Sequence, residues 1–279
     1  MKLSIITINY NDCAGLRKTM ESVLTQTYRD FEYVVVDGAS TDDSVDVIRA
    51  SALQAEALNL KWLSEPDKGI YNAMNKGIEM AHGEYLLFLN SGDYLVDESV
   101  LENVLPFLGE IDIIQGNTIE EIRGKLYRNR GYGKSDIDLF DVMKGHFLHQ
   151  ASFCRKELFD KYGMYDESYR IAGDTKFFMN CLGRKDATFK YIDLDIANYD
   201  VTGISAQHTT LQKKEADRIY AELFSGRIIS FYYANSKKVS LYDKLHKNKC
   251  IWYVVMALVH MCNFFCKQDS TSPQKVLIK

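Results

Sequence analysis

The sequence predicts an α/β fold in which a mostly parallel sheet is flanked by helices. Two observations support this prediction. Strand-like and helix-like patterns alternate through residues 1–100, and the apolar runs at residues 34–36 and 86–89 are continuous. Continuous apolar runs are typical of parallel strands that are buried on both faces. Strands separated by helices of this length form βαβ units with right-handed crossovers.

Each expected element of the N-terminal part has a local signal. Leu16, Met20 and Val23 recur at helical spacing, and an acidic and hydroxyl-rich segment at residues 42–44 suits a helix N-terminus. Short apolar or β-rich runs bounded by turn residues indicate strands. The expected strands lie at residues 3–8, 31–36, 58–63 and 85–89, and the expected helices at residues 16–27, 42–57 and 70–81.

The alternation loosens after residue 110. Residues 124–134 are rich in Gly and Tyr and read as loops, and from residue 211 the chain is helical and more basic. We therefore expect an α/β domain over residues 1–210 and a helical C-terminal extension over residues 211–279. The further elements expected in the domain are strands at residues 111–115, 151–154 and 189–193 and a helix at residues 173–182.

Composition sets the broad class of the protein. The chain has 279 residues, a mass of 32.0 kDa and a net charge of −4, which argues against a nucleic-acid partner. Its six cysteines are scattered without C-x-x-C pairs, which is typical of reduced thiols in a cytoplasmic protein. The apolar run at residues 3–8 is too short for a signal peptide, so we expect the protein to stay inside the cell.

Polar residues follow each of the first four expected strands. In parallel sheets ligands bind beyond the carboxyl ends of the strands, so these residues should border one crevice. The chain has neither a dinucleotide fingerprint nor a P-loop. Acids at strand ends point instead to a divalent cation that neutralises phosphates, although Asp37 and Asp93 could also cap turns. The strand-end residues are Asn9, Asn11, Asp37, Glu65, Asp67, Asn90 and Asp93.

Three segments carry a family resemblance. Residues 34–44 (VVVDGASTDDS), 64–83 (SEPDKGIYNAMNKGIEMAHG) and 85–93 (YLLFLNSGD) resemble the inverting glycosyltransferases of family 2, which have the GT-A fold. The similarity covers about residues 2–205 and is greatest to the branch acting in bacterial capsule, colanic-acid and O-antigen synthesis. It implies a nucleotide-binding half over about residues 1–110 and an acceptor half over about residues 111–210.

The resemblance implies roles for individual residues on the donor side. Thr7, Asn9 and Asn11 match the strand end that wraps around the nucleotide, and Asp37 matches an acid that reaches the base. Residue 38 is Gly where many relatives have a second acid. The remaining implied donor-side residues are Asp67, Asn75 and Asn90.

The metal motif departs from the family pattern. Many relatives carry Asp-x-Asp-Asp after the fourth strand, and this chain has Asn90-Ser91-Gly92-Asp93. An Asn oxygen can bind a hard cation but adds no charge, so the affinity for metal should be weaker. The resemblance still implies a Mg²⁺ or Mn²⁺ site at Asp93.

Asp174 matches the catalytic acid of the family near the start of a helix. An acceptor hydroxyl must lose its proton as it attacks, and a positioned carboxylate is the usual base. The alternative for Asp174 is a helix N-cap. His149 and Gln150 match a His-Gln pair that contacts the acceptor or the donor sugar, and the alternative for His149 is a structural histidine.

The C-terminal stretch 250–266 is apolar, with basic residues upstream and aromatic residues near its ends. It is short for a transmembrane helix. We expect either peripheral contact with the cytoplasmic face of the inner membrane or packing on the catalytic domain. A membrane position would suit a lipid-linked acceptor.

The leading reading is a hexosyltransferase-type enzyme of cell-surface polysaccharide synthesis. It would move a sugar with inversion from a nucleotide-sugar donor, with UDP preferred, to a glycan or a lipid-linked acceptor. The alternatives are a nucleotidyltransferase of sugar-nucleotide synthesis and a non-catalytic nucleotide- or sugar-binding module. A nucleotidyltransferase usually has a basic, Gly-rich loop after the first strand, and residues 9–15 have no basic residue.

Overall fold

The computed structural model describes residues 1–54, 59–183, 186–203 and 209–235. The described residues fall in two compact units, which divide between Leu223 and Phe224. In the second unit residues 226–235 are helical. The first unit extends past the predicted boundary at residue 210. It includes the helix at Thr209–Leu223, which the sequence predicts as part of the C-terminal extension.

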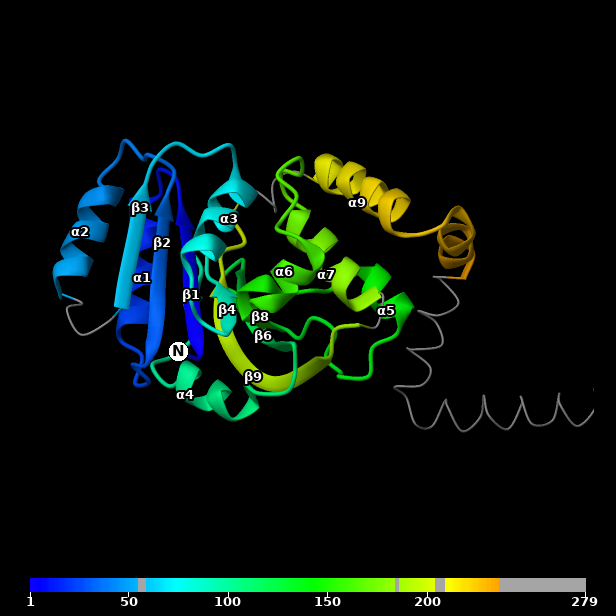
Figure 1. Cartoon of the computed structure of the whole chain (residues 1–279), viewed down its shortest axis with the longest axis horizontal. Helices are drawn as coiled ribbons and strands as arrows, with labels where there is room; N and C mark the ends of the chain where they lie inside the picture. The colour runs from blue at the N-terminus through cyan, green and yellow to red at the C-terminus, as the bar shows by residue number, and fades with distance from the viewer. Residues whose placement is uncertain (55–58, 184–185, 204–208, 236–279) are drawn as a thin grey trace, which may run out of the picture. The chain divides into compact units, whose positions relative to one another are not determined.

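The first unit is a sheet flanked by helices (Figure 1). The strands are β1 (Leu3–Asn9), β2 (Phe31–Asp37), β3 (Asn59–Ser64), β4 (Tyr85–Phe88), β5 (Tyr94–Leu95), β6 (Ile113–Ile122), β7 (Lys125–Asn129), β8 (Ser152–Arg155) and β9 (Phe189–Tyr199). The α-helices are α1 (Cys13–Leu24), α2 (Ser44–Gln54), α3 (Ile70–Met80), α4 (Val100–Val104), α5 (Leu139–Lys144), α6 (Glu157–Tyr162), α7 (Gly173–Gly183) and α9 (Thr209–Leu223). Two 3₁₀-helices are η1 (Leu105–Phe107) and η2 (His149–Ala151).

The N-terminal half of the sheet is parallel, as predicted. The strand order is β3-β2-β1-β4-β8-β6-β9-β5, and β1 is parallel to both β2 and β4. The register aligns the strand ends, since Asn9 is paired with Asp37 and Asp37 with Ser64. The polar residues that follow β1, β2 and β3 are therefore delivered to one edge of the sheet.

Beyond β4 the sheet becomes mixed. Strand β8 is antiparallel to β4 and β6, whereas β6 and β9 run parallel. Pairing of β6 with β9 shifts register on both sides of Asn117, and β9 is visibly curved (Figure 1). A bulge of this kind bends the strands that carry it. The curvature lets the end of β9 return to the polar edge of the parallel half, where β9 pairs with β5.

The prediction of loops over residues 124–134 is wrong for part of that range. Strand β7 lies there, and the strand expected at residues 111–115 runs on as β6 to Ile122. Residues Lys125–Arg128 are exposed, and β7 pairs with β6 alone. A strand exposed on both faces has no apolar alternation, so its sequence carries no strand signal.

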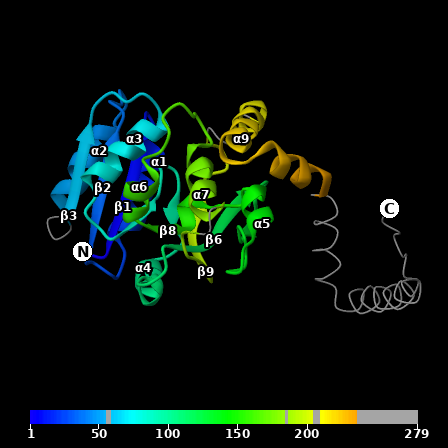
Figure 2. The same cartoon turned by 45° about the vertical axis from the view of Figure 1, so that its right-hand side comes forward.

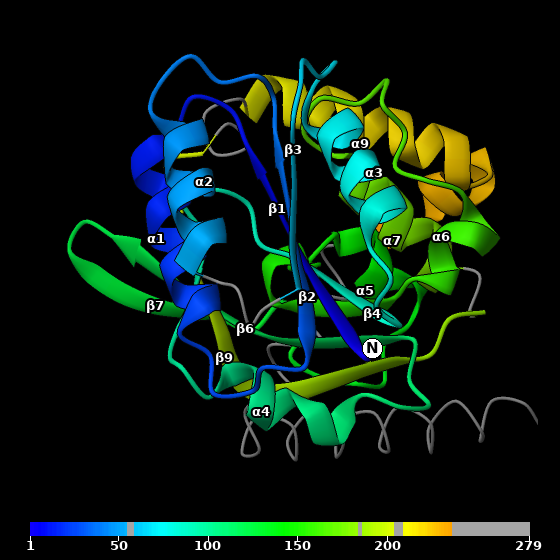
Figure 3. The same ribbon diagram turned by 60° about the vertical axis from the view of Figure 1, so that its left-hand side comes forward.

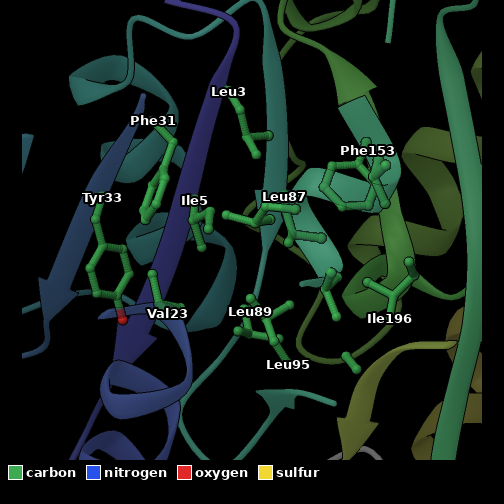
Figure 4. Packing of buried hydrophobic residues seen from close by; sticks show 14 of the residues in the cluster. Leu3, Ile5, Val23, Phe31, Tyr33, Leu87, Leu89, Leu95, Phe153 and Ile196 are labelled. Carbon is green, nitrogen blue, oxygen red and sulfur yellow. The ribbon is translucent and has the colours of Figure 1, made fainter. Parts of the chain in front are cut away.

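Helices cover both faces of the parallel half. Figure 3 shows α1 and α2 on one side of β1, β2 and β3, with α3, α6 and α7 on the other. The core lies on the side of α1, where Ile5 of β1 sits between Tyr33 of β2 and Leu87 of β4 (Figure 4). Val23 of α1 and Ile196 of β9 belong to the same cluster. One core therefore joins the parallel strands to the curved strand β9.

Helix α9 lies next to α7 within the first unit (Figure 2), and the two helices are in contact. Within the part of the chain that the structure describes, no helix combines the length and apolar character needed to cross a membrane. Residues 250–266, for which we expected peripheral membrane contact, lie outside the described residues.

A buried carboxylate ties β2 to its neighbours. Glu32 is fully buried, and its Oε2 accepts hydrogen bonds from Ser4 Oγ and His82 N, both at 2.6 Å. Its Oε1 lies 2.6 Å from Lys61 Nζ. Burial raises the pKa of Glu32, but the hydrogen bonds from Lys61, Ser4 and His82 outweigh it and lower the pKa to about 2.

This network predicts a specific sensitivity to acid. The pKa of Glu32 is lower in the folded chain than the ordinary 4.5, so its stabilisation is present above pH 4.5 and is lost as the pH falls towards 2. Glu32→Gln should lower the free energy of unfolding at pH 7 by about 1–3 kcal/mol. It should also flatten the loss of stability below pH 4.5, measured by urea unfolding followed by circular dichroism.

The matched control is Glu79→Gln, an exposed change on α3. It should keep the acid dependence of the wild type. An equally steep acid dependence in Glu32→Gln would show that other carboxylates cause the effect.

Candidate active site

A polar cleft of about 1050 Å³ opens at the carboxyl edge of the sheet. It runs from the ends of β1 and β4 past η2 and the start of α7 to the β6–β7 hairpin. The described residues that line the cleft include several Asp and Glu residues but no Lys or Arg. The predicted site residues that line the cleft are Asn9, Asn11, Asp67, Asn90, Asp93, His149, Gln150 and Asp174.

Three predicted donor-side residues do not line the cleft. Thr7 is fully buried, and its hydroxyl donates to the carbonyl of Leu89 at 2.7 Å. Asn75 exchanges two hydrogen bonds with the backbone of Tyr165, at 2.9 and 3.0 Å. Both side chains therefore join segments of the fold instead of facing the cleft.

Asp37 is the third of these residues and organises the turn after β2. Its carboxylate is fully buried and accepts hydrogen bonds from Asn9 Nδ2 at 2.8 Å, Ser64 Oγ at 2.7 Å and Ser40 N at 3.0 Å. Burial raises the pKa of Asp37, but these donors and the Ser40 hydroxyl lower it to below its usual range. Asp37 thus stays ionised and holds three strand ends together.

Asp67 occupies the space beside Gly38. A Cβ placed on Gly38 would lie 2.4 Å from Asp67 Oδ2, so a side chain at residue 38 and the present position of Asp67 exclude each other. Asp67 is held by a hydrogen bond from Gly69 N to its Oδ1 at 2.9 Å. The carboxylate of Asp67, from the loop after β3, therefore occupies the space that a side chain at residue 38 would need.

Asp174 lines the cleft from the first turn of α7. Its Oδ2 is 2.8 Å from His149 Nδ1, and its Oδ1 accepts hydrogen bonds from Tyr71 Oη at 3.0 Å and Thr175 N at 2.8 Å. Three donors on two oxygens leave one lone-pair position for a substrate. Helix capping is therefore not the only role of Asp174, because its carboxylate also contacts His149 and Tyr71.

The charges of this cluster support one another. Burial raises the pKa of Asp174, but the hydrogen bond and charge of His149, with Thr175 N and Tyr71, lower it to below its usual range. Burial lowers the pKa of His149, but Asp174 and the charge of Asp93 raise it above 6.5. Burial and the charge of Asp174 raise the pKa of Tyr71, so its hydroxyl stays protonated and donates.

Asp93 follows the end of β4 and is 4% exposed. Its Oδ1 accepts a hydrogen bond from Asp200 N at 2.8 Å, which joins β4 to the end of β9. Burial raises the pKa of Asp93 to about 7, against the lowering effect of the Asp200 N–H and the charge of His149. Burial therefore disfavours the charged form of Asp93, and the Asp200 N–H and His149 favour it.

The donor atoms beside Asp93 fit a hard divalent cation. Asn90 Oδ1 is buried and has no hydrogen-bond partner among the described residues, which costs about 1–3 kcal/mol when nothing binds it. Asn90 and Asp93 are linked by a backbone hydrogen bond of 3.0 Å. Within residues 1–203 and 209–235, gaps excepted, no three His, Cys, Asp or Glu residues are grouped to hold a metal. A cation here would take further ligands from phosphate oxygens and water.

Sequence analysis missed three residues of this site. Tyr71 lies within the helix expected at residues 70–81, but nothing in the sequence singled it out, and the same holds for Asp200 and Glu215. Glu215 of α9 is 7% exposed, and it accepts hydrogen bonds from the backbone N–H groups of Arg170, Ile171 and Ala172, just before α7. A Glu within a polar helix reads as a surface residue, so only the contact between α7 and α9 reveals its role.

Solved structures with a similar fold bind nucleotides. The crystal structure of S. aureus TarS 1-349 in complex with UDP has a TM-score of 0.61 and 22% identity, covering 71% of this chain and 60% of that chain. Mannosyltransferase PcManGT from Pyrobaculum calidifontis, in complex with GDP-Man and Mn²⁺, has a TM-score of 0.60 and 17% identity, covering 79% of this chain and 63% of that chain. At these identities the likeness shows the fold, which is the expected GT-A-like sheet.

Sequence relatives cover more of the chain at higher identity. A PGL/p-HBAD biosynthesis glycosyltransferase of Mycobacterium bovis is 34% identical, over 77% of this chain and 83% of its own length. An uncharacterised glycosyltransferase of Mycobacterium tuberculosis is 32% identical, over 86% of this chain and 93% of its own length. Residues 4–163 match the model of Glycosyl transferase family 2. The chain therefore belongs to glycosyl transferase family 2, as its strand-end motifs indicated.

Proposed function

We propose that this protein transfers a sugar, with inversion, from a nucleoside-diphosphate sugar to a hydroxyl group of a cell-surface glycan or glycolipid. The observation that carries the proposal is the position of Asp174. Its carboxylate is held by three donors in a polar cleft that the strand-end residues Asn9 and Asn11 also line. Membership of the family gives this arrangement its chemical meaning.

The donor would lie along the ends of β1 and β4. Asn9, Asn11 and Asp67 line this part of the cleft and offer amide and carboxylate groups to a base and a ribose. TarS has been solved with UDP and with UDP-GlcNAc, and PcManGT with GDP-Man. These complexes support a nucleotide-sugar donor here, and we propose UDP as the preferred nucleotide.

The chemical step would be one direct displacement. The acceptor hydroxyl oxygen bonds to the anomeric carbon, the bond from that carbon to the diphosphate oxygen breaks, and the hydroxyl proton passes to Asp174. His149 and Tyr71 hold the carboxylate toward the cleft while it takes the proton. A single displacement inverts the anomeric configuration, so an α-linked donor gives a β-linked product.

Asn90 and Asp93 would hold Mg²⁺ or Mn²⁺. When bound, such a cation neutralises the charge that develops on the diphosphate leaving group. The presence of Mn²⁺ with GDP-Man in the PcManGT structure supports this assignment, as does the lack of any Lys or Arg among the described residues of the cleft.

The acceptor would enter from the side of the β6–β7 hairpin. Thr118 and Glu120 of β6 and Asn129 of β7 line that end of the cleft, and all three offer polar groups to sugar hydroxyls. The apolar C-terminal stretch at residues 250–266, with basic residues upstream of it, supports a position at a membrane surface. We propose a lipid-linked acceptor, with peripheral contact of the protein at the cytoplasmic face of the membrane.

A donor screen with the full-length chain tests the proposed function. Binding of UDP, GDP and dTDP is measured by calorimetry with Mn²⁺ or Mg²⁺, and slow hydrolysis of the matching sugar nucleotides is followed by nucleotide release. We expect binding of one nucleotide and release from its sugar conjugate, in which water replaces the acceptor.

Two outcomes would contradict the proposal. Binding without any release from a full set of sugar nucleotides, even with a mixed glycolipid extract added, would indicate a non-catalytic binding module. Formation of a sugar nucleotide from a nucleoside triphosphate and a sugar phosphate would indicate a nucleotidyltransferase.

A further inference from the structure

Gly92 leaves an opening in the segment that links Asn90 to Asp93. Its φ is +95°, and it carries no side chain at the position where many relatives have an acid. A Cβ placed on Gly92 would lie 2.9 Å from Asp200 Oδ2 and 3.3 Å from Asp200 Cβ. The carboxylate of Asp200, which follows β9, thus occupies the space beside the backbone of residue 92.

Asp200 is fixed in this position from both sides. Its backbone N–H donates to Asp93 Oδ1 at 2.8 Å, and its own Oδ1 accepts hydrogen bonds from Thr202 N at 2.8 Å and Thr202 Oγ1 at 2.7 Å. These contacts use the backbone N–H and Oδ1 of Asp200, and Asp200 Oδ2 has no hydrogen-bond donor among the described residues. Asp93, Asp200 and Asn90 all line the same cleft.

The described lining of the cleft includes several carboxylates and no Lys or Arg. Asp93 and Asp200 supply two of these carboxylates. Asn90 Oδ1 is a further buried acceptor atom, and it has no hydrogen-bond partner among the described residues. Two carboxylates and an amide oxygen, from residues that line one cleft, match the ligands that Mg²⁺ and Mn²⁺ take from proteins.

We propose that Asp200 supplies the second carboxylate of the divalent-cation site, from the end of β9, in the space that a side chain at residue 92 would fill. This inference rests on the proposed function, because the cation would be shared with the diphosphate of the donor. The site therefore combines Asn90 and Asp93 from the segment after β4 with Asp200 from a strand more than a hundred residues later in the chain.

The test is Mn²⁺ binding by the full-length protein at saturating UDP, measured as the loss of the free Mn²⁺ signal in electron paramagnetic resonance. Asp200→Asn should weaken Mn²⁺ binding about 10-fold or more, since it removes a charged ligand. The variant keeps the backbone N–H to Asp93, and its amide oxygen can still accept from Thr202. Its melting temperature should therefore stay close to that of the wild type.

Two further variants sharpen the result. Asp195→Asn removes an acid of the same strand that binds Arg128 and Asn117 outside the cleft, and it should leave Mn²⁺ binding unchanged. Asn90→Asp adds a carboxylate beside Asp93, and it should tighten Mn²⁺ binding and partly restore it in the Asp200→Asn background.

The outcomes separate this proposal from the proposed function. Wild-type Mn²⁺ binding in Asp200→Asn would remove Asp200 from the site and leave the transferase function intact. Equal UDP binding by the wild type in Mn²⁺ and in EDTA would overturn the cation site but keep the donor. Failure to bind UDP, GDP or dTDP under any condition would overturn the proposed function and this proposal with it.

Discussion

Asp174→Asn is expected to lower the rate of sugar-nucleotide turnover by about 10²–10⁴-fold, because it removes the carboxylate that takes the acceptor proton. Binding of the nucleotide should stay within a few-fold of the wild type, since Asp174 is carried by α7, whereas the proposed nucleotide residues Asn9 and Asn11 lie at or just after the end of β1. The amide of Asn can still accept hydrogen bonds from Tyr71 and Thr175. The loss should therefore appear in kcat, measured by nucleotide release, and not in the Kd for UDP, measured by calorimetry.

Asp112→Asn is the matched control for this change. Asp112 also accepts hydrogen bonds from a backbone N–H and a hydroxyl, both of Thr188, but it does not line the cleft. It should keep wild-type turnover. Turnover within about 10-fold of the wild type in Asp174→Asn would assign the proton to another group and reduce Asp174 to a structural role.

Glu215→Ala should have the second large effect, through the position of Asp174. Glu215 accepts backbone hydrogen bonds from Arg170, Ile171 and Ala172, at 2.8, 3.1 and 2.9 Å. A carboxylate at this place accepts hydrogen bonds from the N–H groups that precede α7. Its negative charge also interacts favourably with the positive, N-terminal end of the helix dipole. Its loss should lower the free energy of unfolding by about 3 kcal/mol and kcat by at least about 10-fold.

A positioning role makes a prediction that a purely structural role does not. The effect should fall on kcat with little change in the Kd for UDP, because α7 carries Asp174 and not the nucleotide side of the cleft. Glu215→Gln keeps an acceptor oxygen and should recover part of the lost rate. Glu222→Gln, on the same helix, removes surface ion pairs with Lys176 and Arg218 and should change neither quantity by much. Equal losses in kcat and in UDP affinity for Glu215→Ala would indicate general unfolding.

The parallel half of the sheet could be predicted because its signals are local. Strands β1, β2 and β4 are buried along their whole lengths, and their continuous apolar runs stand out from the helices between them. The hairpin of β6 and β7 and the two-residue strand β5 have no such signal. Strand β7 is exposed, and β5 is defined by its pairing with β9. Pairings between distant segments are not encoded in any short window of sequence.

The candidate site divides in a similar way. The rule that ligands bind beyond parallel strands directed attention to Asn9, Asp67, Asn90 and Asp93, all of which line the cleft. It did not distinguish residues that face the cleft from those that face the protein. Asp37 points into the turn after β2, and its oxygens are used by Asn9, Ser40 and Ser64. Sequence position places a residue at an edge, and the backbone conformation decides which way its side chain turns.

The sequence by itself determined the fold class, the crevice at the strand ends and the family to which the chain belongs. These depend on short motifs and on apolar periodicity, both of which can be read directly from the sequence. The tertiary structure alone decided which distant residues complete the site. Asp200 reaches the Asn90–Asp93 segment because β9 bends at a bulge and returns to the polar edge, and Glu215 reaches α7 because α9 packs against it. Both are single charged residues in polar surroundings, and their roles follow from three-dimensional contacts.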